Sequence, residues 1–292
     1  MTGPPPLFDR ALIRRRLARA ARKPASFLLD RVAIDFAERL SLVSRPFPRA
    51  LDLGTPGPQI AETLEAQGRI IVRAAPIIER PHSPLLLIGD EEALPFASES
   101  FDLIVSGLCL QWANDLPGAL VQIRRALAPD GLFLAALAGG QSLIELRTAL
   151  TSAEAQLVGG ASPRVAPFAD IRDLGHLLQR AGFALPVTDV EPLVARYDSM
   201  LALMRDLRAM GATNALAERS RVPLRRDVLL RAVEIYAERF ADQDGRVRAT
   251  FDIVWLSGWA PHESQQKPLA PGSARVRLAD ALNVSEGRLP RD

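Results

Sequence analysis

Short runs of apolar residues recur from residue 49 onward, each bounded by glycine, proline or charged and polar residues. Runs of this kind are typical of parallel strands that are buried on both faces of a sheet. Helix-length segments separate several of them, such as Gln59–Ala66 and Leu116–Leu127. We predict strands at Ala50–Leu53, Ile70–Ala74, Leu85–Ile88, Leu103–Val105 and Leu132–Leu137. Strands that alternate with helices in this way predict a doubly wound α/β sheet.

Helical patterns lie on both sides of this region. Two segments, about Asp9–Arg22 and Pro24–Leu42, precede the first strand, and Pro46 and Pro48 end the second of them. After residue 137 the pattern predicts further helices and two more strands, which brings the sheet to seven. These helices are Gln141–Val158, Ile171–Ala181, Ser199–Met210 and Arg226–Phe240, and the strands are Val187–Tyr197 and Phe251–Trp259.

The same pattern predicts how the chain is divided. Residues 1–48 form an N-terminal helical arm, residues 49–260 the α/β domain, and residues 261–292 a surface tail spaced by proline and glycine. The helices inserted before the last strand, about residues 198–242, are a candidate lid over a binding pocket.

Composition narrows the class of protein. With 48% hydrophobic and 24% charged residues, the chain of 292 residues is typical of a globular protein. No apolar run approaches the about 20 residues that cross a bilayer. Cys109 is the single cysteine, which fits a reducing compartment, so we expect a cytoplasmic protein. The run Arg14–Arg16 is typical of a solvated helix face, and the alternative is a surface for an acidic protein or for peripheral attachment to a membrane.

Candidate site residues lie where the predicted strands end, because ligands of open α/β sheets bind outside the carboxyl ends of the strands. Asp52 follows the first strand, Gly54 allows a tight turn and Gly57 allows close approach of the backbone. Asp90 ends the third strand, where its carboxylate can accept a hydrogen bond from an exocyclic amine or cap the following turn. Ser106 begins the loop after the fourth strand.

Other chemistry-bearing residues give weaker signals. Trp112 and Tyr197 are candidate walls for a substrate, although core packing explains each equally well. His82, His262 and Cys109 have no metal-ligand spacing, so we predict no metal site. Because Ser106 has no histidine near it in the sequence, no catalytic triad is evident. The sequence does not identify catalytic residues.

Taken in order, these segments resemble the class I S-adenosylmethionine (SAM)-dependent methyltransferases, especially the branch with an acidic-Leu-Pro-Phe loop, here Glu92–Phe96, and a Phe-Asp-Leu-Ile strand. The resemblance implies a Rossmann-like sheet that binds SAM. It also implies a role for each matching residue: Asp52, Gly54 and Gly57 around the methionine part, Asp90 and Glu91 at the adenine, and Ser106 and Leu108 beside the reacting sulfonium.

Two departures from this family pattern weaken the expectation of SAM binding. Pro56 and Pro58 replace two glycines of the first loop, and proline has no N–H to offer a ligand. The end of the second strand reads Arg73-Ala74, where the family has a carboxylate for the ribose hydroxyls. Loss of such a charge-assisted hydrogen bond costs roughly 1.5–3 kcal/mol.

Longer motifs extend the resemblance to nearly the whole chain. Phe8–Arg10, Asp173–Phe183, Gly258-Trp259 and Gly272–Ala274 are similar to the complex I assembly factors of methyltransferase fold and their alphaproteobacterial relatives. This family implies a protein substrate, a subunit of respiratory complex I (NADH dehydrogenase), hydroxylated on arginine at the inner face of the membrane, and no nucleic acid. The alternatives are a non-catalytic assembly chaperone and a malonyl-acyl carrier protein methyltransferase of biotin synthesis.

Overall fold

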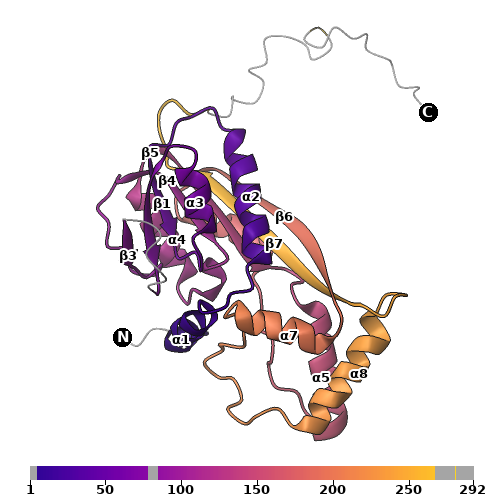
Figure 1. The fold of residues 1–292 in the computed structure, drawn as a ribbon. Helices are drawn as coiled ribbons and strands as arrows, with labels where there is room; N and C mark the ends of the chain where they lie inside the picture. The colour runs from indigo at the N-terminus through magenta and orange to yellow at the C-terminus, as the bar shows by residue number, and fades with distance from the viewer. Residues whose placement is uncertain (1–4, 78–84, 267–279, 281–292) are drawn as a thin grey trace, which may run out of the picture. The chain divides into compact units, whose positions relative to one another are not determined.

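Seven strands form one mixed sheet in the computed structural model (Figure 1). Their order across the sheet is β3-β2-β1-β4-β5-β7-β6, with β1 to β5 parallel and β7 antiparallel to both of its neighbours. The strands are β1 (Arg49–Leu53), β2 (Ile70–Ala75), β3 (Leu86–Ile88), β4 (Phe101–Gly107), β5 (Leu127–Gly139), β6 (Ala184–Tyr197) and β7 (Val247–Trp259). The predicted doubly wound, seven-stranded Rossmann-like sheet is confirmed.

The helices also occur where the sequence predicts them, with ends that differ by a few residues. They are α1 (Arg10–Ala20), α2 (Phe27–Ser41), α3 (Gln59–Glu65), α4 (Leu116–Ala126), α5 (Ile144–Val158), α6 (Ile171–Arg180), α7 (Met200–Ala209) and α8 (Arg226–Phe240). A short 3-10 turn, η1 (Leu110–Trp112), follows β4.

The structure describes residues 5–77, 85–266 and 280. His82 and the Gly272–Ala274 motif therefore lie outside the described residues, as does most of the predicted tail. The chain divides into two units, Met1–Pro261 and His262–Asp292, and the first contains every element named above.

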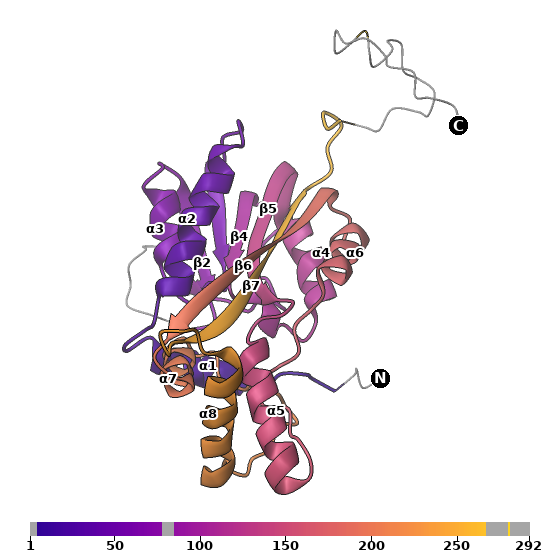
Figure 2. The same ribbon diagram turned by 90° about the vertical axis from the view of Figure 1, so that its right-hand side faces the viewer.

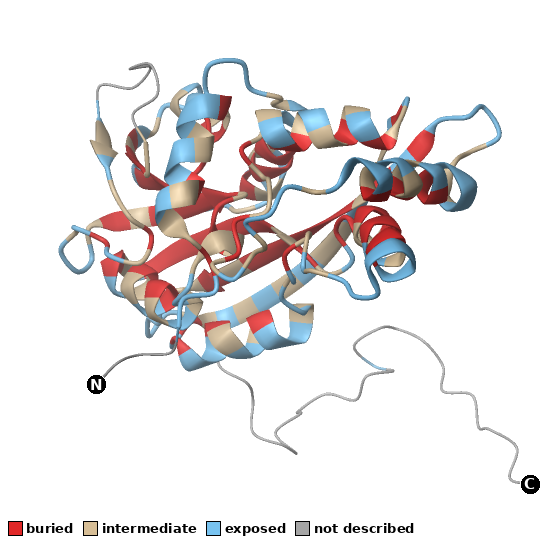
Figure 3. Ribbon diagram, turned by 90° about the horizontal axis from the view of Figure 1, so that it is seen from below, coloured by how far each residue is buried: buried red, intermediate tan, exposed pale blue. Residues whose placement is uncertain are grey.

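Two layers of helices cover the sheet. In Figure 2, α2 and α3 lie on one face and α4 and α6 on the other. Trp255 of β7 packs on Phe36 of α2, with ring centroids 4.9 Å apart. On the opposite face Phe133 of β5 stacks on Phe183, with centroids 5.4 Å apart. The apolar strands are consequently buried between two helical layers, as Figure 3 shows.

A second group of helices lies beyond the carboxyl ends of the parallel strands. There α5 and α8 pack side by side, and α7 lies near α1 (Figures 1 and 2). Helix α1 is docked at its start, because Phe8 forms a β-bridge with Leu216 and the Asp9 N–H donates to the Ala215 carbonyl at 2.9 Å. The α1 and α7 helices thus lie where an open α/β sheet binds its ligands.

Among the described residues, no helix combines the length and apolar character that a membrane crossing requires.

Candidate active site

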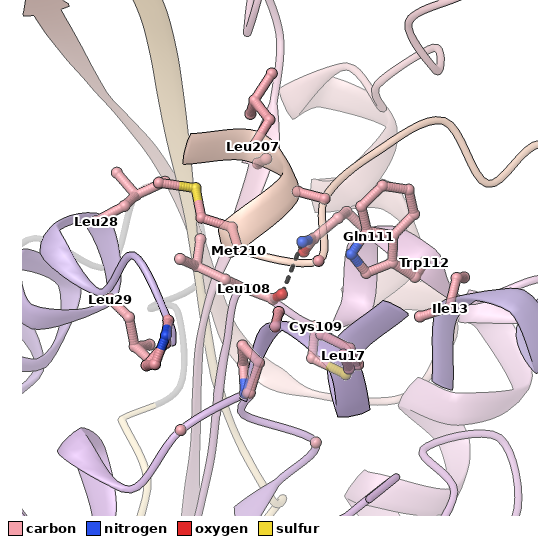
Figure 4. Close-up of a pocket in the computed structure, with 18 of the residues that line it drawn as sticks. Ile13, Leu17, Leu28, Leu29, Leu108, Cys109, Gln111, Trp112, Leu207 and Met210 are labelled. Carbon is pink, nitrogen blue, oxygen red and sulfur yellow. Dashed lines mark hydrogen bonds between the residues drawn. The ribbon is translucent and has the colours of Figure 1, made fainter. Parts of the chain in front are cut away.

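A cavity of about 170 Å³ lies at the carboxyl ends of β1 and β4. Its walls come from α1, α2, the loop after β1, the segment around η1 and the end of α7. Most of the lining is apolar, and Figure 4 shows Leu28, Leu29, Leu108 and Met210 around it. The cavity therefore occupies the position predicted for the ligand, and α1 is one of its walls.

The loop after β1 makes a tight turn at Gly54, whose φ is +74°. A side chain is excluded here for a second reason, since a Cβ on Gly54 would lie 2.3 Å from the Cys109 sulfur. A Cβ on Gly57 would lie 2.8 Å from a methyl group of Leu29. Both glycines are thus required by close packing within the protein, and both line the cavity.

A buried arginine holds this loop from behind, which the sequence reasoning missed. Arg73 of β2 is 2% exposed, and its Nε donates to the Asp52 carboxylate at 3.2 Å. Its Nη2 donates to the loop carbonyls of Thr55 at 3.3 Å and Gly57 at 2.7 Å. The signal that could have revealed it is a charged residue in an otherwise apolar strand, because a buried charge requires a partner.

Asp52 orients the loop and does not line the cavity. Besides Arg73, it accepts a hydrogen bond from the Thr55 hydroxyl, and Thr55 Oγ1 in turn accepts from the Gly107 N–H at 3.0 Å. Burial raises the pKa of Asp52 to about 6, although the charge of Arg73 opposes this shift. The network therefore ties the ends of β1, β2 and β4 together.

The acidic loop after β3 is bound by α1. Arg10 donates to Glu91 and, at 2.8 Å, to Asp90, while Arg14 contacts the other Asp90 oxygen at 2.5 Å. Asp90 also caps its own turn, because it accepts from the Glu92 N–H at 3.0 Å. Of the two roles that the sequence left open for Asp90, the structure shows the turn cap. The other partners of this carboxylate are arginines of the same chain, and its hydrogen bond to an exocyclic amine stays a prediction.

Cys109 lies between the loop and Glu91, and it lines the cavity. Burial and the neighbouring Glu91 carboxylate raise the pKa of its thiol. The residue is consequently a protonated thiol that packs against Gly54, and it is a poor nucleophile.

Two amide oxygens in the cavity wall lack hydrogen-bond donors among the described residues. They are Oε1 of Gln59 and Oε1 of Gln111, and both are buried. The Gln111 amide is held by its nitrogen, which donates to the Leu108 carbonyl at 2.7 Å (Figure 4). Since a buried polar atom without a partner costs free energy, these two acceptors favour a ligand that brings donors.

Two wall residues have a left-handed backbone although they are not glycine. Leu108 has a φ of +51° and Leu143 a φ of +56°. Such conformations cost roughly 1–3 kcal/mol each and are concentrated at functional sites. Two of the five such residues within the described ranges thus line the cavity, which supports it as a candidate site independently of the resemblance.

Comparison with known proteins agrees with this geometry. The model for the family "Methyltransferase domain" matches residues 58–135. The chain is 40% identical to the mitochondrial arginine-hydroxylase NDUFAF5 of Danio rerio, over 98% of this chain and 92% of that protein, and 41% identical to the human protein, over 96% and 84%. It belongs to the methyltransferase-fold family of these arginine hydroxylases.

Other relatives lie further away. The chain is 36% identical to the malonyl-[acyl-carrier protein] O-methyltransferase of Xylella fastidiosa (strain M23), over 87% of this chain and 89% of that protein. A solved structure of a putative methyltransferase from Bacillus halodurans C-125 is 14% identical and superposes with a TM-score of 0.52, covering 78% of this chain and 99% of that one. The latter likeness supports the fold alone.

The residues of this chain that the family resemblance places at the cofactor divide into two groups. Gly54, Gly57, Glu91 and Leu108 line the cavity. Asp52, Asp90 and Ser106 do not: the first two are bound by arginines, and Ser106 is fully buried. The roles that the resemblance implies for them at a cofactor stay predictions.

The two predicted substrate walls also differ. Trp112 lines the cavity and meets Phe8 edge to face, with centroids 5.3 Å apart. Tyr197 is absent from the lining and is buried in the hydrophobic core. For Tyr197, the last residue of β6, the structure thus shows the core packing that the sequence left open as the alternative. No cluster of potential metal ligands occurs within the described ranges.

Proposed function

We propose that this chain is a SAM-dependent enzyme that modifies a side chain of a protein substrate and thereby assists the assembly of respiratory complex I. The observation that carries the proposal is the coincidence of two features. The cavity with its strained walls lies where the family pattern predicts the cofactor, and the similarity to the arginine hydroxylases extends over nearly the whole chain.

Two buried hydrogen-bond acceptors in the cavity wall fit SAM. The amide oxygens of Gln59 and Gln111 have no donor in the part of the chain that the structure describes, and the ammonium and adenine amino groups of SAM would bring donors. The apolar walls, among them Leu29 and Leu108, would exclude water. When bound, SAM supplies a sulfonium cation with electrophilic carbon substituents. The position for the ribose hydroxyls fits less well, since Ala74 is buried and carries no carboxylate.

Entry of SAM requires α1 to move. The cavity of about 170 Å³ is smaller than the roughly 300–1,000 Å³ of typical ligand pockets. Ion pairs of Arg10 and Arg14 hold α1 against the acidic loop, and Arg14 is nearly half exposed. We expect these pairs to break and reform as the cofactor enters and leaves.

Isothermal titration of the purified chain with SAM tests the proposal. Met210 lines the cavity at the end of α7, so Met210→Trp fills the space and should abolish binding. Leu201→Trp adds the same ring to an exposed position of α7 and should leave binding unchanged. No heat of binding at millimolar SAM in the unaltered chain would exclude a SAM-dependent enzyme. It would favour the non-catalytic assembly chaperone. Two observations support that alternative: Ala74 lies where the family has the ribose carboxylate, and Arg73 binds the loop after β1.

A deletion strain tests the process. Loss of NADH-dependent respiration and of a modified peptide from a complex I subunit is the expected result. Mass spectrometry of that peptide separates added oxygen from an added methyl group. Because a relative at 36% identity is a malonyl-[acyl-carrier protein] O-methyltransferase, a need for biotin with intact complex I would instead support that activity. Membrane attachment and a cytoplasmic location stay part of the proposal, to be checked by cell fractionation.

A further inference from the structure

Arginines surround two adjoining hollows of about 550 and 390 Å³ beside the cavity. We treat the two together and call them the arginine hollow. They are formed by α1, the end of α7 and the segments around residues 164 and 213–224, and among the described residues no acidic side chain lines them. The arginines that line them are Arg16, Arg19, Arg164, Arg208, Arg219 and Arg221.

Three of these side chains are held in place. Arg16 donates to the carbonyls of Thr213 at 2.6 Å and Asn214 at 2.5 Å. Arg164 binds Glu154 at 2.7 Å, and Arg219 binds the Leu216 carbonyl at 2.8 Å and Asp9 at 3.3 Å. Fixed guanidinium groups recognise carboxylates well, since less side-chain freedom is lost on binding.

Most of the positive charge here is uncompensated. Within the described ranges, Arg19, Arg208 and Arg221 form no ion pair. Arg16 donates to two carbonyls, and the charge of Asp9, which is paired with Arg219, also acts on it. Burial, followed by the charge of Arg219, lowers the pKa of Arg16. Like charges therefore oppose one another across the hollow, and an anion from outside would relieve that repulsion.

An apolar hollow of about 260 Å³ lies between the arginine hollow and the cavity. It shares Arg16, Arg164 and Arg208 with the arginine hollow. It shares Trp112, Leu143, Phe168, Leu207 and Ala212 with the cavity. The arginine hollow, the apolar hollow and the cavity therefore adjoin one another in this order. Guanidinium donors lie at the outer end, and the amide acceptors of Gln59 and Gln111 lie at the inner end.

We infer that the arginine hollow binds an acidic segment of the protein substrate, next to the side chain that enters the cavity. This inference rests on the proposed function for the identity of the substrate. The outer end would hold the substrate by charge, because its guanidinium groups attract carboxylates, and the apolar hollow would lead the neighbouring side chain toward the cavity. An acidic protein segment is favoured over a membrane surface because the guanidinium groups converge in a hollow and three are fixed in direction.

A peptide-binding experiment tests the inference without SAM. The probe is a short fluorescein-labelled peptide of alternating glutamate and serine, added to the full chain and followed by fluorescence anisotropy. Arg208→Glu combined with Arg221→Glu should weaken binding about tenfold, as loss and reversal of two partly exposed charges predict. Arg239→Glu combined with Arg226→Glu makes the same change of charge on α8, outside the hollow, and should leave binding nearly unchanged.

The outcomes separate the alternatives. Peptide binding that only the hollow variants lose supports the inference. Equal losses in both double variants, or no peptide binding, would overturn it. So would binding to phosphatidylserine vesicles without binding to the peptide, which would identify a membrane surface. The SAM titration is independent of this result, so a failed proposed function and a failed acidic-segment site are distinguished.

Discussion

Arg73 and Arg10 both donate to carboxylates beside the cavity, but they do so from different environments. Arg73 belongs to a central strand, is 2% exposed, and binds both Asp52 and the loop carbonyls. Arg10 belongs to the N-terminal helix, has a 16% exposed side chain, and binds Asp90 and Glu91 of the acidic loop.

The difference assigns distinct tasks to the two arginines. Arg73 is buried with its counter-charge and also binds two loop carbonyls, so it fixes the shape of the loop. Of the pairs that hold α1, Arg14–Asp90 lies near solvent, where the screening length of salt is about 8 Å at physiological ionic strength. Arg10 and Glu91 are less exposed, but Arg10 belongs to the same helix. Arg73 therefore belongs to the permanent frame of the site, and Arg10 and Arg14 to the part that opens.

The largest expected effect comes from Arg73→Met. It leaves Asp52 buried without a counter-charge, which should lower the free energy of unfolding by about 3–5 kcal/mol. Denaturant titration measures this change. The double variant Arg73→Met/Asp52→Leu removes both charges and should recover most of the loss. No recovery would mean that Arg73 acts through the loop carbonyls alone.

The second effect is a dependence on pH. Because the pKa of Asp52 is raised to about 6 from 3.8, the folded state binds this proton more tightly than the unfolded state does. The stabilisation is complete below about pH 4 and is lost as the pH rises through 6. Relative to Asp52→Asn, the free energy of unfolding of the unaltered chain should fall by roughly 2–3 kcal/mol across this pH range, because each unit of pKa shift corresponds to about 1.4 kcal/mol. If the difference in the free energy of unfolding between the two proteins does not change with pH, the raised pKa of Asp52 is contradicted.

Arg10→Met should cost less, about 2 kcal/mol, since Glu91 is buried and loses its charged donor. Denaturant titration measures this change, as it does for Arg73→Met. A loss of stability as large as that of Arg73→Met would show that the two arginines do not differ as we describe.

Arg14→Met should have the smallest effect, within about 0.5–1 kcal/mol, because its side chain is nearly half exposed. The readout is stability at low and at high salt. The small contribution of Arg14 should disappear at high salt while that of Arg73 persists. A salt-independent contribution of Arg14 would argue against an α1 that opens.

The sequence predicted the architecture well because the strands carry local signals. The runs at Ile70 and Leu103 differ from β2 and β4 only in their ends, and the insertion between β6 and β7 was located correctly. The start of β5 was missed because Leu127 is the last residue of a predicted helical segment, whereas in the structure it pairs with Phe101 of β4. Hydrogen bonding across the sheet overrides the local preference there.

The site was predicted only in part. Gly54 and Gly57 follow from their position after a strand, which is local information, whereas Glu91 follows from the family resemblance alone. The partners of Asp52 and Asp90 are distant in the sequence, and nothing local to Arg73 or Arg10 indicates which carboxylate each one binds. For the same reason the sequence left two positions open for Tyr197, because a residue at the end of a strand can turn either way, and the ring lies in the core.

The docking of α1 has a consequence for the order in which the molecule is completed. Phe8 and Asp9 are bound by Leu216 and Ala215, more than 200 residues later in the chain. Proteins are synthesised from the N-terminus, at roughly 5–20 residues per second, and contacts of such long range form late in folding. The first helix must therefore wait until Ala215 and Leu216, which follow α7, have emerged from the ribosome. A nascent or truncated chain would lack a closed cavity, so only a finished molecule could retain a ligand.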